Sequence, residues 1–293
     1  MNTVSLLEGP FDQDKLQHIR HQLAQHPLMS RESLGALAMR HPPEFVRFHD
    51  GVRGMATKLG DVLGVDPKRD RLRKCIESLE AAKTFVQIIN VPSDSMYRPL
   101  IAEFHAEVAE LFPRGQRDFV NRDAAAFLAS PRSVTPYHLD HEQNFLLHIA
   151  GPKTLYTWRH DDRGMVSEQV LEVFYGDNSS RDVHCPDDAK ATARVFELQP
   201  GDGVFMPMGS PHAVETGDGV TITFSMLMNT RSAMERVRSY EANHKLRKLG
   251  LSPRPVGSPA RDFVKRSALQ VYRRSKALLK GNRRERSGSS PWY

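Results

Sequence analysis

The chain has 293 residues, of which 39% are hydrophobic and 26% charged, so it can bury a full core and has neither a disordered nor a membrane-like composition. Its only two cysteines, Cys75 and Cys185, lack the paired spacing of disulfide frameworks, iron–sulfur sites and zinc fingers. The N-terminus has neither a basic leader nor a long apolar core, so we expect a cytoplasmic protein.

The net charge of +6 is concentrated at the C-terminal end of the chain. Residues 260–293 contain ten Lys or Arg and two Asp or Glu, a local charge of +8, which leaves the rest of the chain at −2. A general preference of the whole protein for polyanions is therefore not indicated.

Residues 1–120 predict a mixed, mainly helical flank. Apolar residues three and four apart favour amphipathic helices over 14–26 (DKLQHIRHQLAQH) and 70–82 (DRLRKCIESLEAA). The run TFVQIINV at 84–91 favours a strand that ends before Pro92. Helical spacing then resumes over 93–112, and a Ser or Asp residue is expected to cap that helix.

Residues 121–230 change character to short apolar runs separated by Gly and Pro. Examples are QNFLLHIAG, KTLYTWRH, ARVFELQPG and VTITFSMLMN. Several short strands with turn signals between them predict an all-β sandwich or barrel rather than alternating strands and helices. We therefore expect a mainly β core with helical flanks.

Helical spacing returns after this β region. Residues 231–259 predict a helix that ends near Gly250, followed by a Pro/Gly/Ser linker. Residues 260–293 predict a basic amphipathic tail, with Val264, Ala268, Val271, Tyr272 and Leu279 on one helical face.

Three residues from distant parts of the β region suggest a metal site. His138 and Asp140 stand two apart in TPYHLDHEQN, so on an extended chain both side chains point to the same side. His212 ends the pattern G-x5-P-x-G-x2-H, which begins at Gly201 and resembles the second sequence motif of the cupins. That resemblance implies a double-stranded β-helix, that is, a jelly-roll or cupin barrel.

Two imidazoles and one carboxylate on one side of a metal leave the opposite coordination positions open, as in non-haem Fe(II) oxygenases. His138, Asp140 and His212 are therefore predicted both as the metal ligands and as the catalytic centre. Zinc also accepts this donor set.

The run TPYHLDHEQNFLLHIAGPK resembles the core of Jumonji-C-type 2-oxoglutarate oxygenases, particularly the asparaginyl hydroxylase branch that acts on hypoxia-inducible factor. The resemblance covers about residues 121–230. It implies Fe(II) as the metal, 2-oxoglutarate as the co-substrate, and a hydroxylation that releases succinate and carbon dioxide.

The same resemblance implies residues that bind the co-substrate. Lys153, thirteen residues beyond Asp140, matches the family lysine that pairs with the distal carboxylate. Thr135 is expected to hydrogen-bond that carboxylate and Asn144 to line the co-substrate site. Ser225 stands where the family carries an asparagine.

Two further histidines lie close to the motif. His148 shares strand parity with Asn144, and it can be read either as a residue that reaches the co-substrate or as a core histidine. His141 is expected to point away from the site.

Two other classes of function stay open at this stage. Cupin barrels also serve as isomerases, metal-binding proteins and ligand-binding regulators, and a catalytically silent scaffold is a third reading. Met206, Met208 and Gly209 replace the aromatic residues of the family around the second histidine, so the family's substrates do not transfer. The substrate is therefore left as a protein side chain, a small molecule or a lipid-linked sugar.

The basic tail also has alternative roles. It is read as a solvated or dimer-forming helix, or as a helix on anionic membrane headgroups, which would give peripheral membrane association. Nucleic acid binding is disfavoured because no recognised motif is present. Homodimer formation through 232–249 is a further expectation by analogy with the family.

Overall fold

A computed structural model describes residues 3–50, 54–57, 64–65, 69–81 and 83–279. The strands are β1 (Val4–Leu6), β2 (Gln17–His21), β3 (Val46–Asp50), β4 (Gly64–Val65), β5 (Thr84–Ile88), β6 (Asn121–Ala129), β7 (Val134–His138), β8 (Gln143–Ala150), β9 (Lys153–Thr157), β10 (Arg194–Leu198), β11 (Asp202–Met206), β12 (His212–Thr216) and β13 (Thr221–Asn229). The α-helices are α1 (Arg31–Arg40), α2 (Arg69–Glu77), α3 (Arg98–Ala109), α4 (Glu168–Gly176), α5 (Ala189–Thr192), α6 (Arg231–Lys248) and α7 (Pro259–Leu279).

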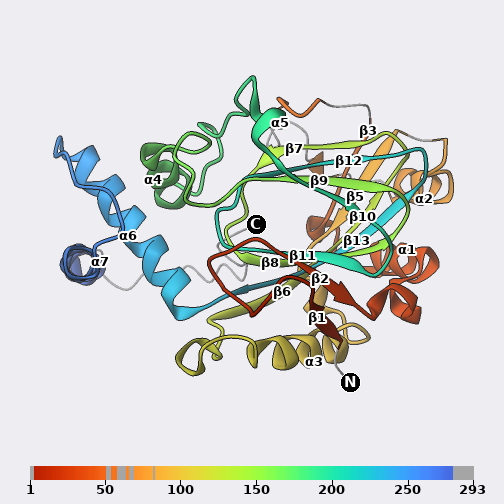
Figure 1. Cartoon of the computed structure of the whole chain (residues 1–293), viewed down its shortest axis with the longest axis horizontal. Coiled ribbons are helices and arrows are strands. Elements are labelled where there is room, and N and C mark those ends of the chain that lie inside the picture. Colours follow the sequence, from red (N-terminus) through yellow and green to blue (C-terminus); the bar gives the residue numbers. More distant parts are fainter. Residues whose placement is uncertain (1–2, 51–53, 58–63, 66–68, 82, 280–293) are drawn as a thin grey trace.

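These strands form two antiparallel sheets that face each other (Figure 1). One sheet has the order β1-β2-β11-β8-β13-β6-β5-β3-β4, and the other has the order β10-β9-β12-β7. Apolar side chains from both sheets meet between them, including Leu146 and Val204 from the larger sheet and Leu155 and Val214 from the smaller one. The β core with helical flanks is therefore confirmed, and its arrangement is that of a jelly roll.

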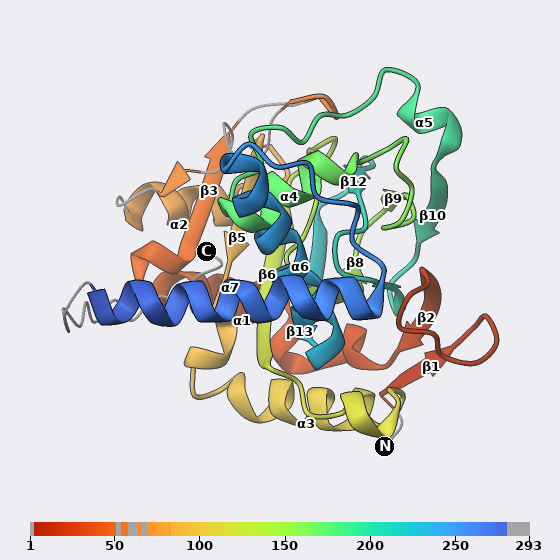
Figure 2. The same cartoon turned by 90° about the vertical axis from the view of Figure 1, so that its left-hand side faces the viewer.

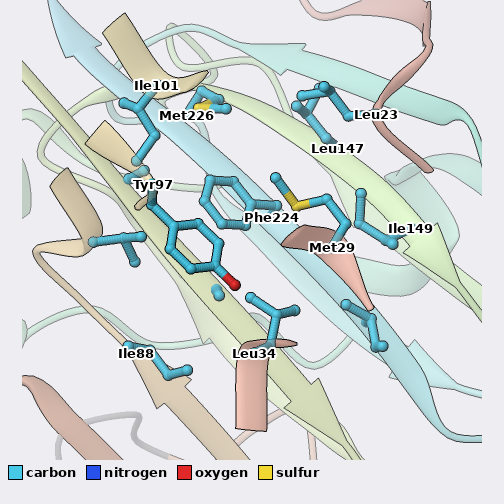
Figure 3. Close-up of a cluster of buried hydrophobic side chains, with 14 of the residues drawn as sticks. Leu23, Met29, Leu34, Ile88, Tyr97, Ile101, Leu147, Ile149, Phe224 and Met226 are labelled. Carbon is cyan, nitrogen blue, oxygen red and sulfur yellow. The ribbon is translucent and has the colours of Figure 1, made fainter. Parts of the chain in front are cut away.

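The outer face of the larger sheet is covered by helices. Alternate residues of β13 divide between the two faces because successive side chains on a strand point to opposite sides. Phe224 and Met226 pack with Tyr97 and Ile101, at the start of α3, and with Leu34 of α1, as Figure 3 shows. The residues between them, such as Thr223 and Ser225, therefore point into the barrel.

The sequence prediction was wrong for residues 14–26, which contain β2 instead of a helix. β2 pairs with β1 on one side and with β11 on the other, and its residues alternate between buried and more exposed positions. The apolar spacing of this segment suits a helix, but pairing with β11 satisfies its backbone groups and buries Ile19 completely.

The predicted helix at 93–112 exists but starts later. α3 begins at Arg98 with Pro99 in its first turn, and no side chain caps it, so the expected Ser or Asp cap was wrong. The predicted strand at 84–91 and the predicted helix at 70–82 are present but shorter, as β5, which ends at Ile88, and α2, which ends at Glu77.

The C-terminal helices lie at one side of the barrel (Figures 1 and 2). α6 and α7 confirm the predicted helices, and Gly250 ends α6 with φ +80°, a conformation that glycine adopts easily. α4 and α5 were not predicted. α4 is attached to α6 by the buried Glu172, which pairs with Arg247 and accepts a hydrogen bond from Asn243 at 3.0 Å.

The division of the chain at residues 120, 230 and 259 stays a prediction about domains. The larger sheet takes strands from both of the first two parts, since β1 to β5 precede residue 121. Residues 280–293 of the predicted tail, and the side chain of Leu279, lie outside what is described. None of the described helices combines the length and the apolar composition that a bilayer span requires.

Candidate metal centre

His138 and His212 are brought together by strand pairing. His138 is the last residue of β7 and His212 the first of β12, and the two residues lie directly opposite each other in the antiparallel register. Their ring centroids are 4.0 Å apart. Asp140 follows β7, and its carboxylate oxygens lie 3.8 Å from Nε2 of His138 and 3.7 Å from Nε2 of His212. The three ligand atoms thus lie within 4.8 Å of one another.

Hydrogen bonds orient these three side chains. Nδ1 of His138 lies 2.7 Å from the carbonyl oxygen of Pro136, and Nδ1 of His212 lies 3.1 Å from that of Ser210. Each Nδ1 therefore donates its proton to the backbone, and each Nε2 presents a lone pair toward Asp140. Nδ2 of Asn144 donates to Asp140 at 3.0 Å. This is the arrangement in which imidazoles and carboxylates bind a cation.

The electrostatics favour the same donor set. Burial, reinforced by the neighbouring His212, holds the pKa of His138 well below its usual value, so its imidazole is neutral at pH 7. Burial acts to raise the pKa of Asp140, but His212, His138 and the Asn144 hydrogen bond outweigh it and lower that pKa. The neutral imidazole of His138 beside an ionised carboxylate suits a divalent transition metal such as Fe(II) or Zn(II).

A β-bulge places Thr135 on the same inner face as the histidines. The register runs from His212 opposite His138 to Val214 opposite Thr135, so β7 has one extra residue between these pairs. Thr135 and His138 are three residues apart, and on a regular strand such residues point to opposite sides. The extra residue of the bulge returns Thr135 to the side on which His138 lies. Pro136, which has no backbone N–H to donate, lies inside the bulge.

Lys153 lies in the interior of the same barrel. It is the first residue of β9, it is buried, and its ammonium donates to Oγ1 of Thr223 on β13. Among the described residues, no carboxylate lies within ion-pair distance of it. Burial lowers the pKa of Lys153 to about 7. A buried ammonium without an anion is costly, so this position suits an anionic ligand.

The metal centre and Lys153 lie at opposite ends of β9. His212 pairs with Thr157, four residues from Lys153, which corresponds to about 13 Å along the strand. Leu155 of β9, Val214 of β12 and Leu146 of β8 meet between the two ends. Ser225 pairs with Leu146 and lies two residues from Thr223 on the inner face of β13.

The other predicted residues, Asn144 and His148, lie at opposite ends of the barrel interior. Asn144 contacts Asp140 and therefore lies at the metal end. His148 is fully buried and lies opposite Thr223, at the lysine end, where its Nε2 donates to the carbonyl of Gly151 at 2.6 Å. Burial and the nearby Lys153 lower the pKa of His148 to about 4, so it is neutral. His141 is not part of the three-residue cluster and stacks on Phe174, with ring centroids 4.0 Å apart.

Sequence reasoning missed two neighbours of the site. Thr223 contacts Lys153. The sequence feature that could have indicated it is the alternation of Thr221, Thr223 and Ser225 in a strand that is otherwise apolar. Tyr175 of the unpredicted α4 approaches Gly209, where a Cβ would lie 2.8 Å from the tyrosine hydroxyl. The amide of Gly209 donates to the carbonyl of Asp140 at 3.3 Å. No sequence signal placed α4 beside the site.

Two facing antiparallel sheets that enclose a cluster of two histidines and one aspartate define the class of double-stranded β-helix proteins. The family model for the cupin-like domain matches residues 51–232, and the chain belongs to that family. No curated protein matches the chain at a significant level.

Among solved structures, the chain is similar to Escherichia coli YcfD at 15% identity and a TM-score of 0.50, over 96% of this chain and 70% of that one. This likeness shows a shared fold. A YcfD structure with cobalt and 2-oxoglutarate gives 14% identity and a TM-score of 0.43, over 92% of this chain and 64% of that one. The YcfD complex with cobalt and succinic acid gives 15% identity and a TM-score of 0.43, over 92% of this chain and 65% of that one. YcfD is described as a ribosomal oxygenase. The chain spans only about two thirds of the length of these relatives.

Proposed function

We propose that the protein is an Fe(II)- and 2-oxoglutarate-dependent oxygenase that hydroxylates a substrate not yet identified. One observation carries this proposal. A buried lysine without a carboxylate partner in the described structure occupies the same barrel as a two-histidine, one-carboxylate cluster. A dicarboxylate that chelates a metal at one end and meets the ammonium at the other satisfies both features.

His138, Asp140 and His212 would hold the iron. Ferrous iron with bound co-substrate would supply the oxidation, in which 2-oxoglutarate would lose carbon dioxide and take up one oxygen atom of dioxygen as succinate, while the other oxygen atom would enter a substrate C–H bond. The carbonyls of Pro136 and Ser210 keep both imidazoles in the tautomer that presents Nε2. The Asp140 side chain is 27% exposed, so substrate would approach from the metal end.

Lys153 and Thr223 would bind the distal carboxylate of 2-oxoglutarate, with Thr135 donating from β7. Ser225 would line the middle of the co-substrate site, and its short side chain leaves room there. Asn144 would hold Asp140 in position and contact the co-substrate near the metal. The apolar Leu146, Leu155 and Val214 would exclude water along the carbon chain.

Three substrate classes are candidates within this proposal. The motif resembles the asparaginyl hydroxylase branch, and the solved relative of similar fold is a ribosomal oxygenase, so a protein side chain is one candidate. A small molecule and a lipid-linked sugar are the others. A cytoplasmic location and a homodimer likewise stay predictions of the sequence, as does the expectation that nucleic acid is not a partner.

Anaerobic titration of the purified protein with Fe(II) and then 2-oxoglutarate tests the proposal without any substrate. We expect the weak visible charge-transfer band of an iron-bound 2-oxo acid. Lys153→Met should retain iron and lose the band at moderate 2-oxoglutarate concentration, whereas His138→Ala should lose iron itself. Iron binding without a band at saturating 2-oxoglutarate would instead support a metal-binding cupin without this chemistry.

A further inference from the structure

α7 is held to the protein by one side only. Leu269 is buried, and Arg266 and Arg273 pair with Glu235 and Glu241 of α6 at 3.3 and 2.9 Å. These three residues of α7 recur at the spacing of a single helical face. Figures 1 and 2 show α7 as the outermost element on this side of the molecule. Its opposite face therefore looks into solvent.

That outer face is apolar along its centre. Val264 and Val271 are 65% and 64% exposed, and the exposed Ala268 lies between them. At about 100° per residue these three side chains lie opposite the face that packs on α6. Phe263 and Tyr272, 63% and 52% exposed, flank them on either side. Exposed apolar residues in a continuous row on a helix mark an interaction surface.

Cations border the apolar row on both sides. Arg261 lies on the edge near Tyr272 and Arg274 on the edge near Phe263, by the same angular spacing. Unlike Arg266 and Arg273, neither forms an ion pair with any described residue. The only acidic residue of α7 is Asp262, which is buried and bonded to the amide of Gly257. The exposed face therefore combines an apolar centre with unneutralised positive edges.

We propose that α7 binds the surface of an anionic phospholipid membrane, lying flat with Val264 and Val271 among the acyl chains near the headgroups. Apolar residues bordered by arginines and aromatic rings are what such a surface selects, since the cations attract anionic headgroups. Nucleic acid would leave the valine row uncovered.

A series of contacts connects this surface to the metal end of the barrel. α7 packs on α6, α6 binds α4 through Glu172, and α4 contacts the site through Phe174 on His141 and Tyr175 beside Gly209. Membrane binding through α7 therefore keeps the helical layer beside the candidate metal centre close to the bilayer.

Flotation of the full-length protein with lipid vesicles tests the proposal. We expect co-flotation with phosphatidylcholine vesicles that contain about 30% phosphatidylglycerol, and little with phosphatidylcholine alone. Arg261→Gln/Arg274→Gln should lower the partition coefficient by about thirtyfold, given the usual contribution of each arginine at an anionic surface. Val264→Asp/Val271→Asp should abolish co-flotation.

The matched control is Val120→Asp/Val195→Asp, which makes the same change at two exposed valines outside α7. It should float like the wild type. Circular dichroism and Fe(II) binding of all variants establish that they are folded. The proposal is wrong if the wild type stays with neither vesicle, or if Val264→Asp/Val271→Asp floats normally. Dimerisation or RNA binding through α7 without flotation would also overturn it.

Discussion

His138 and His212 face each other across β7 and β12, at the point where β12 starts and β7 ends. The chain separates them by four strands of the barrel, β8 to β11, and by the helices α4 and α5. Their side chains can therefore share a metal only in the folded protein, and metal binding should stabilise the fold by linkage.

Removal of a ligand should abolish that linkage. We expect His138→Ala and Asp140→Ala to lose Fe(II) affinity by more than the roughly 10–100-fold typical of residues that only support a ligand. Asn144→Ala, which removes a support of Asp140, should fall within that range. Isothermal titration with Fe(II) under nitrogen measures the change. His184→Ala, at an exposed histidine, is the control and should bind as the wild type does.

Lys153→Met should raise the stability of the ligand-free protein and at the same time weaken the binding of 2-oxoglutarate. The substitution replaces a buried ammonium by an apolar side chain of similar length, so we expect the ligand-free protein to gain about 1–3 kcal/mol in the free energy of unfolding. The same variant should lose 2-oxoglutarate affinity by at least about 100-fold, because the distal carboxylate then has no cation. Urea denaturation and co-substrate titration provide the two measurements, with Lys83→Met as the surface control. A destabilised variant that binds normally would contradict both expectations.

The pH dependence of co-substrate affinity follows from the same lysine. Burial lowers the pKa of free Lys153 to about 7, and a bound carboxylate raises it again. Binding therefore takes up a proton above pH 7, and the apparent Kd should rise by up to about tenfold per pH unit between pH 7 and 9. Below pH 6 this dependence should vanish. Lys153→Met should show none of it, and an equally steep profile in that variant would assign the effect to another group.

The unliganded protein should show the opposite trend in stability. The pKa of Lys153 is lower in the folded than in the unfolded state, so the unfolded chain binds more protons between these two values. The lysine contribution to the free energy of unfolding should therefore rise with pH from about 7 to 10. Thermal denaturation of wild type and Lys153→Met across this range isolates the contribution as a difference.

Gly209→Ala tests the approach of α4 to the metal end. Gly209 has φ +75°, and an added Cβ would lie 2.8 Å from the Tyr175 hydroxyl. We expect a loss of about 1–3 kcal/mol in stability, together with weaker Fe(II) binding because the Gly209 amide contacts Asp140. Tyr175→Phe should relieve the steric part of this loss in the double variant. Gly115→Ala, where the added carbon meets no atom, should change neither quantity.

Short-range sequence patterns predicted the secondary structure correctly wherever local residue spacing and burial in the fold favour the same structure. Alternating or apolar runs bounded by Gly and Pro predicted the barrel strands, and the helix spacing of 231–249 predicted α6. Residues 14–26 show the limit of this approach, because their spacing fits a helix until β11 offers a backbone edge to pair with. Which competing structure wins there depends on a partner far away in the chain.

The sequence alone determined the residue types of the candidate site, since His138, Asp140 and His212 lie in motifs whose spacing carries chemical meaning, and the family resemblance implied Lys153. Only the tertiary structure decided that Thr223 meets Lys153, that α4 lies beside Gly209, and that the apolar face of α7 is left open. The reason is that a motif constrains neighbours along one strand or turn. Contacts between sheets and helices depend on packing that forms between distant segments.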